Sequence, residues 1–111
     1  MADGQSFGER VRELRKAQGM TQRSLAQGIG IDFTYLSKIE TGSLPPPSEA
    51  AIGRIAEVLK ADYDELLGVA RKVPSDLGRT LASAPVEAAI LVRRLKTLSP
   101  EQLRRILEIT K

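Results

Sequence analysis

Apolar side chains recur every three or four positions along the first seventy residues, which is the spacing of one face of a helix. Residues 7–18 carry such a stripe. Ser6 and Glu9 have the spacing of a capping box at its start, and Gly19 can take the left-handed conformation that ends a helix. This stretch therefore predicts a first helix.

Residues 21–42 show the most informative pattern, because two short amphipathic segments follow each other across a tight turn. Thr21 and Asp32 are side chains that begin helices well, Gly30 suits the turn, and Gly42 suits the end of the second segment. The side chains that this pattern turns inward are Leu25, Ala26, Leu36 and Ile39. We expect two helices, the second of which presents polar and aromatic side chains outward.

The remaining elements are also predicted to be helical. Prolines stiffen residues 43–47 into an extended connector, and helices are expected over residues 48–60 and 62–68. Composition shifts after residue 72, and Ser75, Pro85 and Ser99 mark three further helix starts. The fold class is therefore all-α, with a five-helix domain over residues 1–70 and a small helical segment over residues 71–111.

Composition narrows the possible functions. The chain has 111 residues and contains neither cysteine nor histidine, which removes disulfides, thiolate metal sites and the commonest general base. It also lacks a phosphate-cradling glycine loop and a clustered pair of carboxylates. We expect no catalysis, no cofactor and no metal. No apolar run approaches the roughly 18 residues that a membrane span needs, and the first residues do not resemble a signal peptide. The expected location is cytoplasmic, without membrane contact.

Charge is distributed unevenly around a net value of +3. Residues 1–70 hold eight basic and ten acidic side chains, a balance of −2, whereas residues 71–111 hold nine basic and four acidic ones, a balance of +5. If the first part binds nucleic acid, phosphate contacts must come from local placement of charge, from backbone amides and from helix ends.

The first part of the chain, over about residues 6–67, resembles the Cro and phage-repressor-like (XRE) helix-turn-helix family. The resemblance is carried by residues in a fixed order: Leu14, Arg15, Gly19, Met20, Thr21, Gln22, Leu25, Ala26, Ile29, Gly30, Tyr35, Leu36, Ser37, Lys38, Ile39, Glu40, Gly42, Pro47, Ser48, Ile55, Ala56, Asp64, Glu65, Leu66 and Leu67. It implies a lambda-repressor-like domain that places its third helix in the major groove of double-stranded DNA.

The resemblance also implies roles for single residues. Gln22 would hold a phosphate and brace the recognition helix, and Arg15 and Glu40 would form a buried salt bridge. Thr34 and Lys38 share the outward face of the third helix and are candidates for base contact. The full set of expected DNA contacts is Gln22, Arg23, Phe33, Thr34, Tyr35, Ser37, Lys38 and Thr41.

Several of these positions keep a second interpretation. Phe33 stands where relatives often carry a polar or basic residue, and it can either touch a base or pack against its neighbours. Tyr35 can contact a phosphate or belong partly to the core, and Arg23 can reach the backbone or remain a solvated charge. Asp32 is expected to cap its helix, not to read a base. Lys60 stands where relatives have a helix-ending glycine, and we expect it to alter that turn.

The C-terminal residues carry more apolar surface than short helices can hide alone. They therefore cover the N-terminal domain or pair with a second chain, and we expect residues 75–111 to form a homodimer interface. The expected function is a transcriptional regulator, with repression as the expected sign, that binds a short palindromic operator as a homodimer. The alternative is an antitoxin or another regulator whose C-terminal helices bind a different protein.

Overall fold

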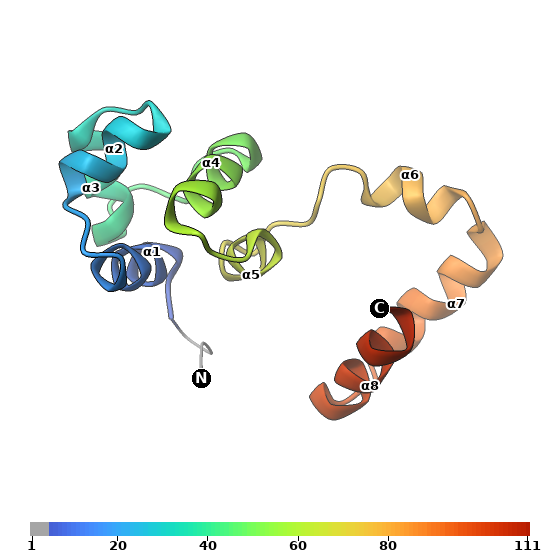
Figure 1. The fold of residues 1–111 in the computed structure, drawn as a ribbon. Coiled ribbons are helices and arrows are strands. Elements are labelled where there is room, and N and C mark those ends of the chain that lie inside the picture. The colour runs from blue at the N-terminus through green and yellow to red at the C-terminus, as the bar shows by residue number, and fades with distance from the viewer. Residues whose placement is uncertain (1–4) are drawn as a thin grey trace. The chain divides into compact units, whose positions relative to one another are not determined.

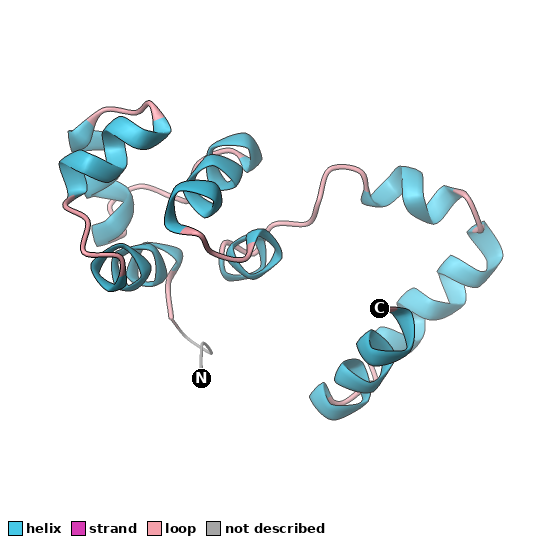
Figure 2. Cartoon of the chain, viewed as in Figure 1, coloured by secondary structure: helices cyan, strands magenta, loops and turns pink. Residues whose placement is uncertain are grey.

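The computed structural model describes residues 5–111, and every regular element in that range is an α-helix (Figure 2). The all-α prediction is confirmed. Contacts within the chain divide it into two compact units, Met1–Pro74 and Ser75–Lys111, which we call the N-terminal unit and the C-terminal unit. Each unit is described by itself.

Five helices build the N-terminal unit, as predicted, and each is preceded by a side chain that accepts a hydrogen bond from a backbone N–H of its first turn. The capping residues are Ser6, Thr21, Asp32, Ser48 and Asp62. The helices are α1 (Phe7–Ala17), α2 (Gln22–Ile29), α3 (Phe33–Thr41), α4 (Glu49–Leu59) and α5 (Tyr63–Val69) (Figure 1).

In three of these helices the C-cap residue itself is left-handed. Gly30 after α2 has a φ of 74°, and Gly42 after α3 has a φ of 85°, so both glycines supply a conformation that side chains disfavour. Lys60 after α4 has a φ of 55°, although it carries a side chain. It therefore keeps the left-handed conformation usual for a helix-ending glycine and, contrary to expectation, does not alter the turn, at a backbone cost of about 1–2 kcal/mol.

The core of the N-terminal unit is the apolar stripe of all five helices turned inward. Its buried members are Phe7, Val11, Leu25, Ala26, Ile29, Leu36, Ile39, Ile52, Ile55, Ala56, Leu59, Leu66 and Leu67. Gly8 lets α1 pass directly over α3, because a Cβ atom there would lie 2.2 Å from the carbonyl oxygen of Ile39. This close crossing sets where α3 lies in the unit.

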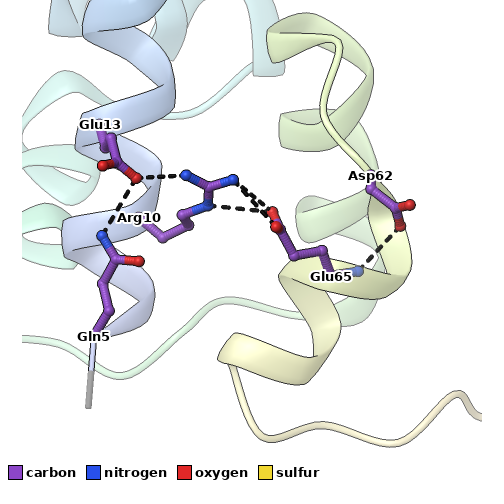
Figure 3. A network of polar contacts seen from close by, with 5 residues as sticks. All are labelled: Gln5, Arg10, Glu13, Asp62 and Glu65. Carbon is purple, nitrogen blue, oxygen red and sulfur yellow. Dashed lines mark hydrogen bonds and ion pairs between the residues drawn. The ribbon is translucent and has the colours of Figure 1, made fainter. Parts of the chain in front are cut away.

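A polar network on the surface joins α1 to α5 (Figure 3). Arg10 donates to both carboxylate oxygens of Glu65, at 3.0 and 3.1 Å from Nη2, and also binds Glu13 one turn along α1. The hydrogen bond from Arg10, followed by one from Gln5, lowers the pKa of the Glu13 carboxyl below its usual value. The same bond to Glu13, with the contact to Glu65, raises the pKa of Arg10.

The C-terminal unit contains three helices, α6 (Leu77–Ala82), α7 (Pro85–Leu95) and α8 (Pro100–Thr110). The expected starts at Pro85 and Ser99 are confirmed, and Ser99 forms a capping box with Gln102. The first of these helices begins later than the position of Ser75 indicates. Its N-cap is Asp76, whose side chain makes no capping bond. The structure describes all residues of α6–α8 and buries none of them.

Candidate nucleic-acid interface

α2 and α3 lie against each other and are joined by three residues (Figure 1). Asp32 Oδ2 accepts a hydrogen bond of 3.0 Å from the amide of Thr34, which confirms that this carboxylate caps α3. The amide of Ile31 bonds the carbonyl of Ala26 at 3.0 Å, so the chain leaves α2 in a fixed direction. The angle between the two helices is therefore set by backbone bonds as well as by packing.

The outer face of α3 is polar. Thr34, Lys38 and Thr41 are exposed and follow each other at intervals of four and three residues, so they share one side of the helix. Leu36 and Ile39 are fully buried on the opposite side. Of the remaining candidates, Ser37 is half-buried, and Tyr35 keeps 36% of its surface exposed. α3 can therefore enter a groove without losing its contacts to the core.

Three helices meet at a buried ion pair. Arg15 Nε lies 2.8 Å from Glu40 Oε2, and Arg15 Nη2 lies 3.0 Å from Glu40 Oε1, so the contact is bidentate. Arg15 also donates to the carbonyl of Met20, at 2.8 Å. The salt bridge that the family resemblance implies between Arg15 and Glu40 is present, and it fixes the end of α3 to α1.

Gln22 joins the same network from the first turn of α2. Its Nε2 donates to Glu40 Oε1 at 2.9 Å, which gives it the bracing role expected from the resemblance. An amide nitrogen carries two N–H groups, and this bond uses one of them. Among the described residues, the second N–H group has no acceptor and can donate to a phosphate, so bracing and DNA contact are compatible in this geometry.

A hollow of about 770 Å³ opens beside this network. Arg12, Arg23, Phe33 and Thr41 line it, together with Gln22 and the paired Arg15 and Glu40. Among the described residues, neither Arg12 nor Arg23 has a carboxylate partner, whereas Arg15 is neutralised by Glu40. The hollow therefore presents two uncompensated positive charges next to the N-terminal end of α2, where backbone N–H groups also favour an anion.

Arg12 is a member of this site that the sequence analysis missed. It lies three residues before Arg15 on α1, so the two side chains share one side of that helix. Once Arg15 is assigned to the contact with α3, the same spacing places Arg12 beside it. The signal was therefore present in the sequence, but it depended on knowing which face of α1 meets α3.

Phe33 and Arg23 contact each other across the turn. The central carbon of the Arg23 guanidinium lies 4.5 Å from the centre of the Phe33 ring, within the range of a cation–π interaction. Phe33 is half-buried and also packs against the core. For Phe33, the interpretation as a residue packed against its neighbours is the one that the contacts support. Arg23, in turn, is held on a ring and is not simply solvated.

Thr41 is exposed at the end of α3, and its hydroxyl is already bonded within the chain. Oγ1 donates to the carbonyl of Lys38 at 3.2 Å and lies 3.1 Å from Oγ of Ser43.

In the described part of the chain, no group of three or more carboxylate, histidine or cysteine side chains is arranged to hold a metal ion. None of the described helices is long and apolar enough to cross a membrane.

The sequence of this chain is similar to known helix-turn-helix proteins. The profile of the family described as "Helix-turn-helix domain" matches residues 6–67. The chain is 42% identical over 64 residues to the uncharacterized HTH-type transcriptional regulator RghRB of Bacillus subtilis, covering 58% of this chain and 46% of that protein. It is 38% identical over 63 residues to the HTH-type transcriptional repressor RghR of the same organism, covering 57% and 47%. The chain thus spans about half the length of these relatives.

A solved structure shows the same fold in the presence of DNA. It is described as the master regulator for biofilm formation SinR in complex with DNA, and it matches with a TM-score of 0.52 and 31% identity. The match covers 55% of this chain and 97% of that chain. The family profile spans α1 to α4 and most of α5.

Proposed function

Because the chain belongs to the helix-turn-helix domain family, we propose that it is a DNA-binding transcriptional regulator that represses its target by occupying an operator. The observation that carries this proposal is the exposed polar face of α3, whose opposite side is buried. In the N-terminal unit, that face lies beside a hollow with two uncompensated arginines. The relatives named as transcriptional regulators and the solved complex with DNA support it.

The reading face of α3 divides into base and backbone contacts. Lys38 can donate to guanine O6 and N7, and Thr34 can hydrogen-bond a base edge or place its methyl group on that of thymine. Ser37 lies between these positions and can contribute one further hydroxyl. With so few polar side chains, a single α3 distinguishes few base pairs, since each good contact contributes about 1–3 kcal/mol.

Phosphate contacts would hold α3 in register on the duplex. Gln22, Arg12 and Arg23 line the hollow at the first turn of α2, and they can donate to one stretch of DNA backbone. Tyr35 and Thr41 carry hydroxyls at the exposed margin of α3 and serve the same purpose. These contacts compensate locally for the net charge of −2 in residues 1–70.

Residues 75–111 provide the second half of this proposal. Their helices expose the apolar side chains Val86, Ile90, Leu95 and Leu107, which a second copy of the chain can cover. A homodimer would present two α3 helices about 34 Å apart to a palindromic site. Two weak reading helices then act together. A DNA-binding function also fits the expected cytoplasmic location.

Selection of bound sequences from random duplex DNA tests the main proposal. The purified full chain is expected to enrich one half-site twice, in inverted orientation, with centres about one helical turn or a multiple of it apart. Recovery of no enriched sequence, even at low salt, contradicts sequence-specific binding. Enrichment of a lone half-site supports DNA reading and contradicts the dimer.

Removal of residues 72–111 tests the role of the C-terminal unit. The shortened chain is expected to stay folded, because the core lies in the N-terminal unit, and to become monomeric with DNA binding weakened 100-fold or more. Light scattering and circular dichroism measure these properties. A truncated chain that still dimerises overturns the assignment of residues 75–111, and a full chain that is monomeric supports intramolecular packing or binding to a different protein.

A further inference from the structure

Phe33 and Arg23 form one unit at the junction of α2 and α3. We propose that Phe33 is a positioning residue that acts through Arg23. Its ring holds the Arg23 guanidinium in place without neutralising the charge, so that the guanidinium can bind a backbone phosphate of DNA. This inference rests on the proposed DNA-binding function. It replaces a direct base contact by Phe33 and gives Arg23 a defined task.

The location of Arg23 makes an anionic partner favourable. Arg23 is the second residue of α2, whose first turn contains no acidic side chain. The N-terminal end of a helix already carries partial positive charge, so an arginine there is unfavourable unless an anion is nearby. Among the described residues, Arg23 makes no ion pair, and the nearby Glu40 is bonded to Arg15 and Gln22. A DNA phosphate in the hollow would supply the missing negative charge.

The Phe33 ring can hold the Arg23 side chain without neutralising its charge, which a carboxylate cannot do. A long arginine side chain loses rotamer entropy when it is immobilised on DNA, which weakens binding. A carboxylate in place of the ring would hold the guanidinium but would also neutralise it. The ring, 4.5 Å from the guanidinium carbon, attracts the cation through its quadrupole and leaves the net charge unchanged. The N–H groups along the edge of the guanidinium plane stay available for oxygen acceptors.

The position of Phe33 fits this supporting role better than base reading. It is the first residue of α3, it is half-buried, and it packs against the core. The core therefore fixes the ring, and the ring fixes Arg23. The exposed side chains of α3 that remain for base contact are Thr34 and Lys38, which leaves the reading face more polar than the sequence indicates.

A double-mutant cycle on DNA affinity tests the inference. The full-length wild-type chain, Arg23→Ala, Phe33→Leu and the double variant are compared on one enriched duplex over a range of salt concentrations. Arg23→Ala is expected to lower the salt slope by about 0.9 for each bound copy. Phe33→Leu keeps the apolar volume but removes the ring. It should weaken binding about two- to five-fold, the size of an exposed cation–π contact, and should also lower the slope. The double variant should bind no more than two-fold more weakly than Arg23→Ala.

Two controls separate this role from others. Phe33→Tyr keeps the ring and should retain both affinity and slope, and circular dichroism of Phe33→Leu excludes a loss of folding as the cause of its weaker binding. Replacing each thymine of the half-site by deoxyuridine removes its methyl group and should affect wild type and Phe33→Leu equally. Any one of three outcomes would overturn the inference. The losses of affinity in the cycle could be multiplicative, the salt slope of Phe33→Leu could be unchanged, or the thymine-methyl effect could disappear in Phe33→Leu. Failure of the wild type to bind any duplex would instead contradict the proposed function.

Discussion

The two units of this chain use apolar side chains in opposite ways. In the N-terminal unit, Leu25 and Leu36 have no exposed surface, whereas Leu107 and Ile109 in the C-terminal unit expose 66% and 82% of theirs. Both units consist of short helices that carry apolar stripes. The difference lies in whether the helices of a unit bury each other's apolar faces. Five helices around one centre can cover each other's stripes, and three helices in sequence leave theirs uncovered.

This difference separates stability from association. Burial of an apolar side chain contributes about 1.5–3 kcal/mol, and that contribution is already realised within the N-terminal unit. In the C-terminal unit the apolar side chains are exposed, so the same contribution can stabilise a contact with another surface. Matched substitutions in the two units should therefore behave differently.

The ion pairs of the two units offer the sharpest contrast. Glu40→Ala leaves the buried Arg15 without its partner and should lower the free energy of unfolding of the N-terminal unit by about 3–5 kcal/mol. Urea unfolding followed by tyrosine fluorescence reports this, because Tyr35 and Tyr63 are the two tyrosines of the chain and both lie in that unit. The matched variant Glu101→Ala breaks the exposed pair with Arg105 and should change stability by no more than about 0.5 kcal/mol, measured by circular dichroism. Equal effects would contradict the contrast.

Glycine substitutions test how closely the helix backbones of each unit pack. Gly8→Ala places a methyl group 2.2 Å from the carbonyl oxygen of Ile39, so α1 and α3 must separate. We expect a loss of about 2–3 kcal/mol in the unfolding of the N-terminal unit. Gly78→Ala in α6 meets no atom within 4 Å and should be neutral or stabilising by up to about 1 kcal/mol, because alanine is the better helix former. A tolerated alanine at position 8 would show that the two helices can move apart freely.

The smallest expected effect concerns the surface network of α1. The pKa of Glu13 is lowered in the folded chain, so its contribution to stability is present above its unfolded pKa of about 4.5 and is lost as the pH falls through the lower folded value. The free energy of unfolding of the N-terminal unit should therefore decrease between about pH 5 and pH 3. Glu13→Gln should flatten that part of the profile.

Arg10→Ala provides the control for this profile, because the Arg10 side chain is the main cause of the lowered pKa of Glu13. In that background, a second substitution Glu13→Gln should change the pH profile little. Tyrosine fluorescence in urea, repeated at several pH values, makes the measurement. An equal flattening with and without Arg10 would show that a group other than Arg10 lowers the pKa of Glu13.

Local rules explain why so many elements could be predicted. Caps at Ser6, Thr21 and Ser48 act within three residues of the chain, and the spacing of apolar positions shows which side of each helix turns inward. The start of α6 is less well marked. Its cap makes no side-chain bond, and the helix begins two residues after Ser75. Prediction was therefore strongest where a short-range hydrogen bond defines the boundary.

The candidate site divides in the same way. The exposed positions Thr34 and Lys38 follow from helical spacing alone, and the Arg15–Glu40 contact was expected from the family resemblance. The spacing of three residues places Arg12 beside Arg15, but only the packing of α1 against α3 brings it to the same hollow as Arg23. From the sequence, Phe33 stays open between base contact and packing, because an aromatic ring at the start of a helix can serve either role.

By itself, the sequence determined the helices, the helix-turn-helix pair and the side of α3 that faces outward, because capping and periodicity act over a few residues. The tertiary structure decided which distant side chains meet. It brought Glu40 to Arg15 and Gln22, and it set the ring of Phe33 against Arg23. Such contacts depend on how close helices approach and on their register, which are properties of the packed core and not of any local stretch of sequence.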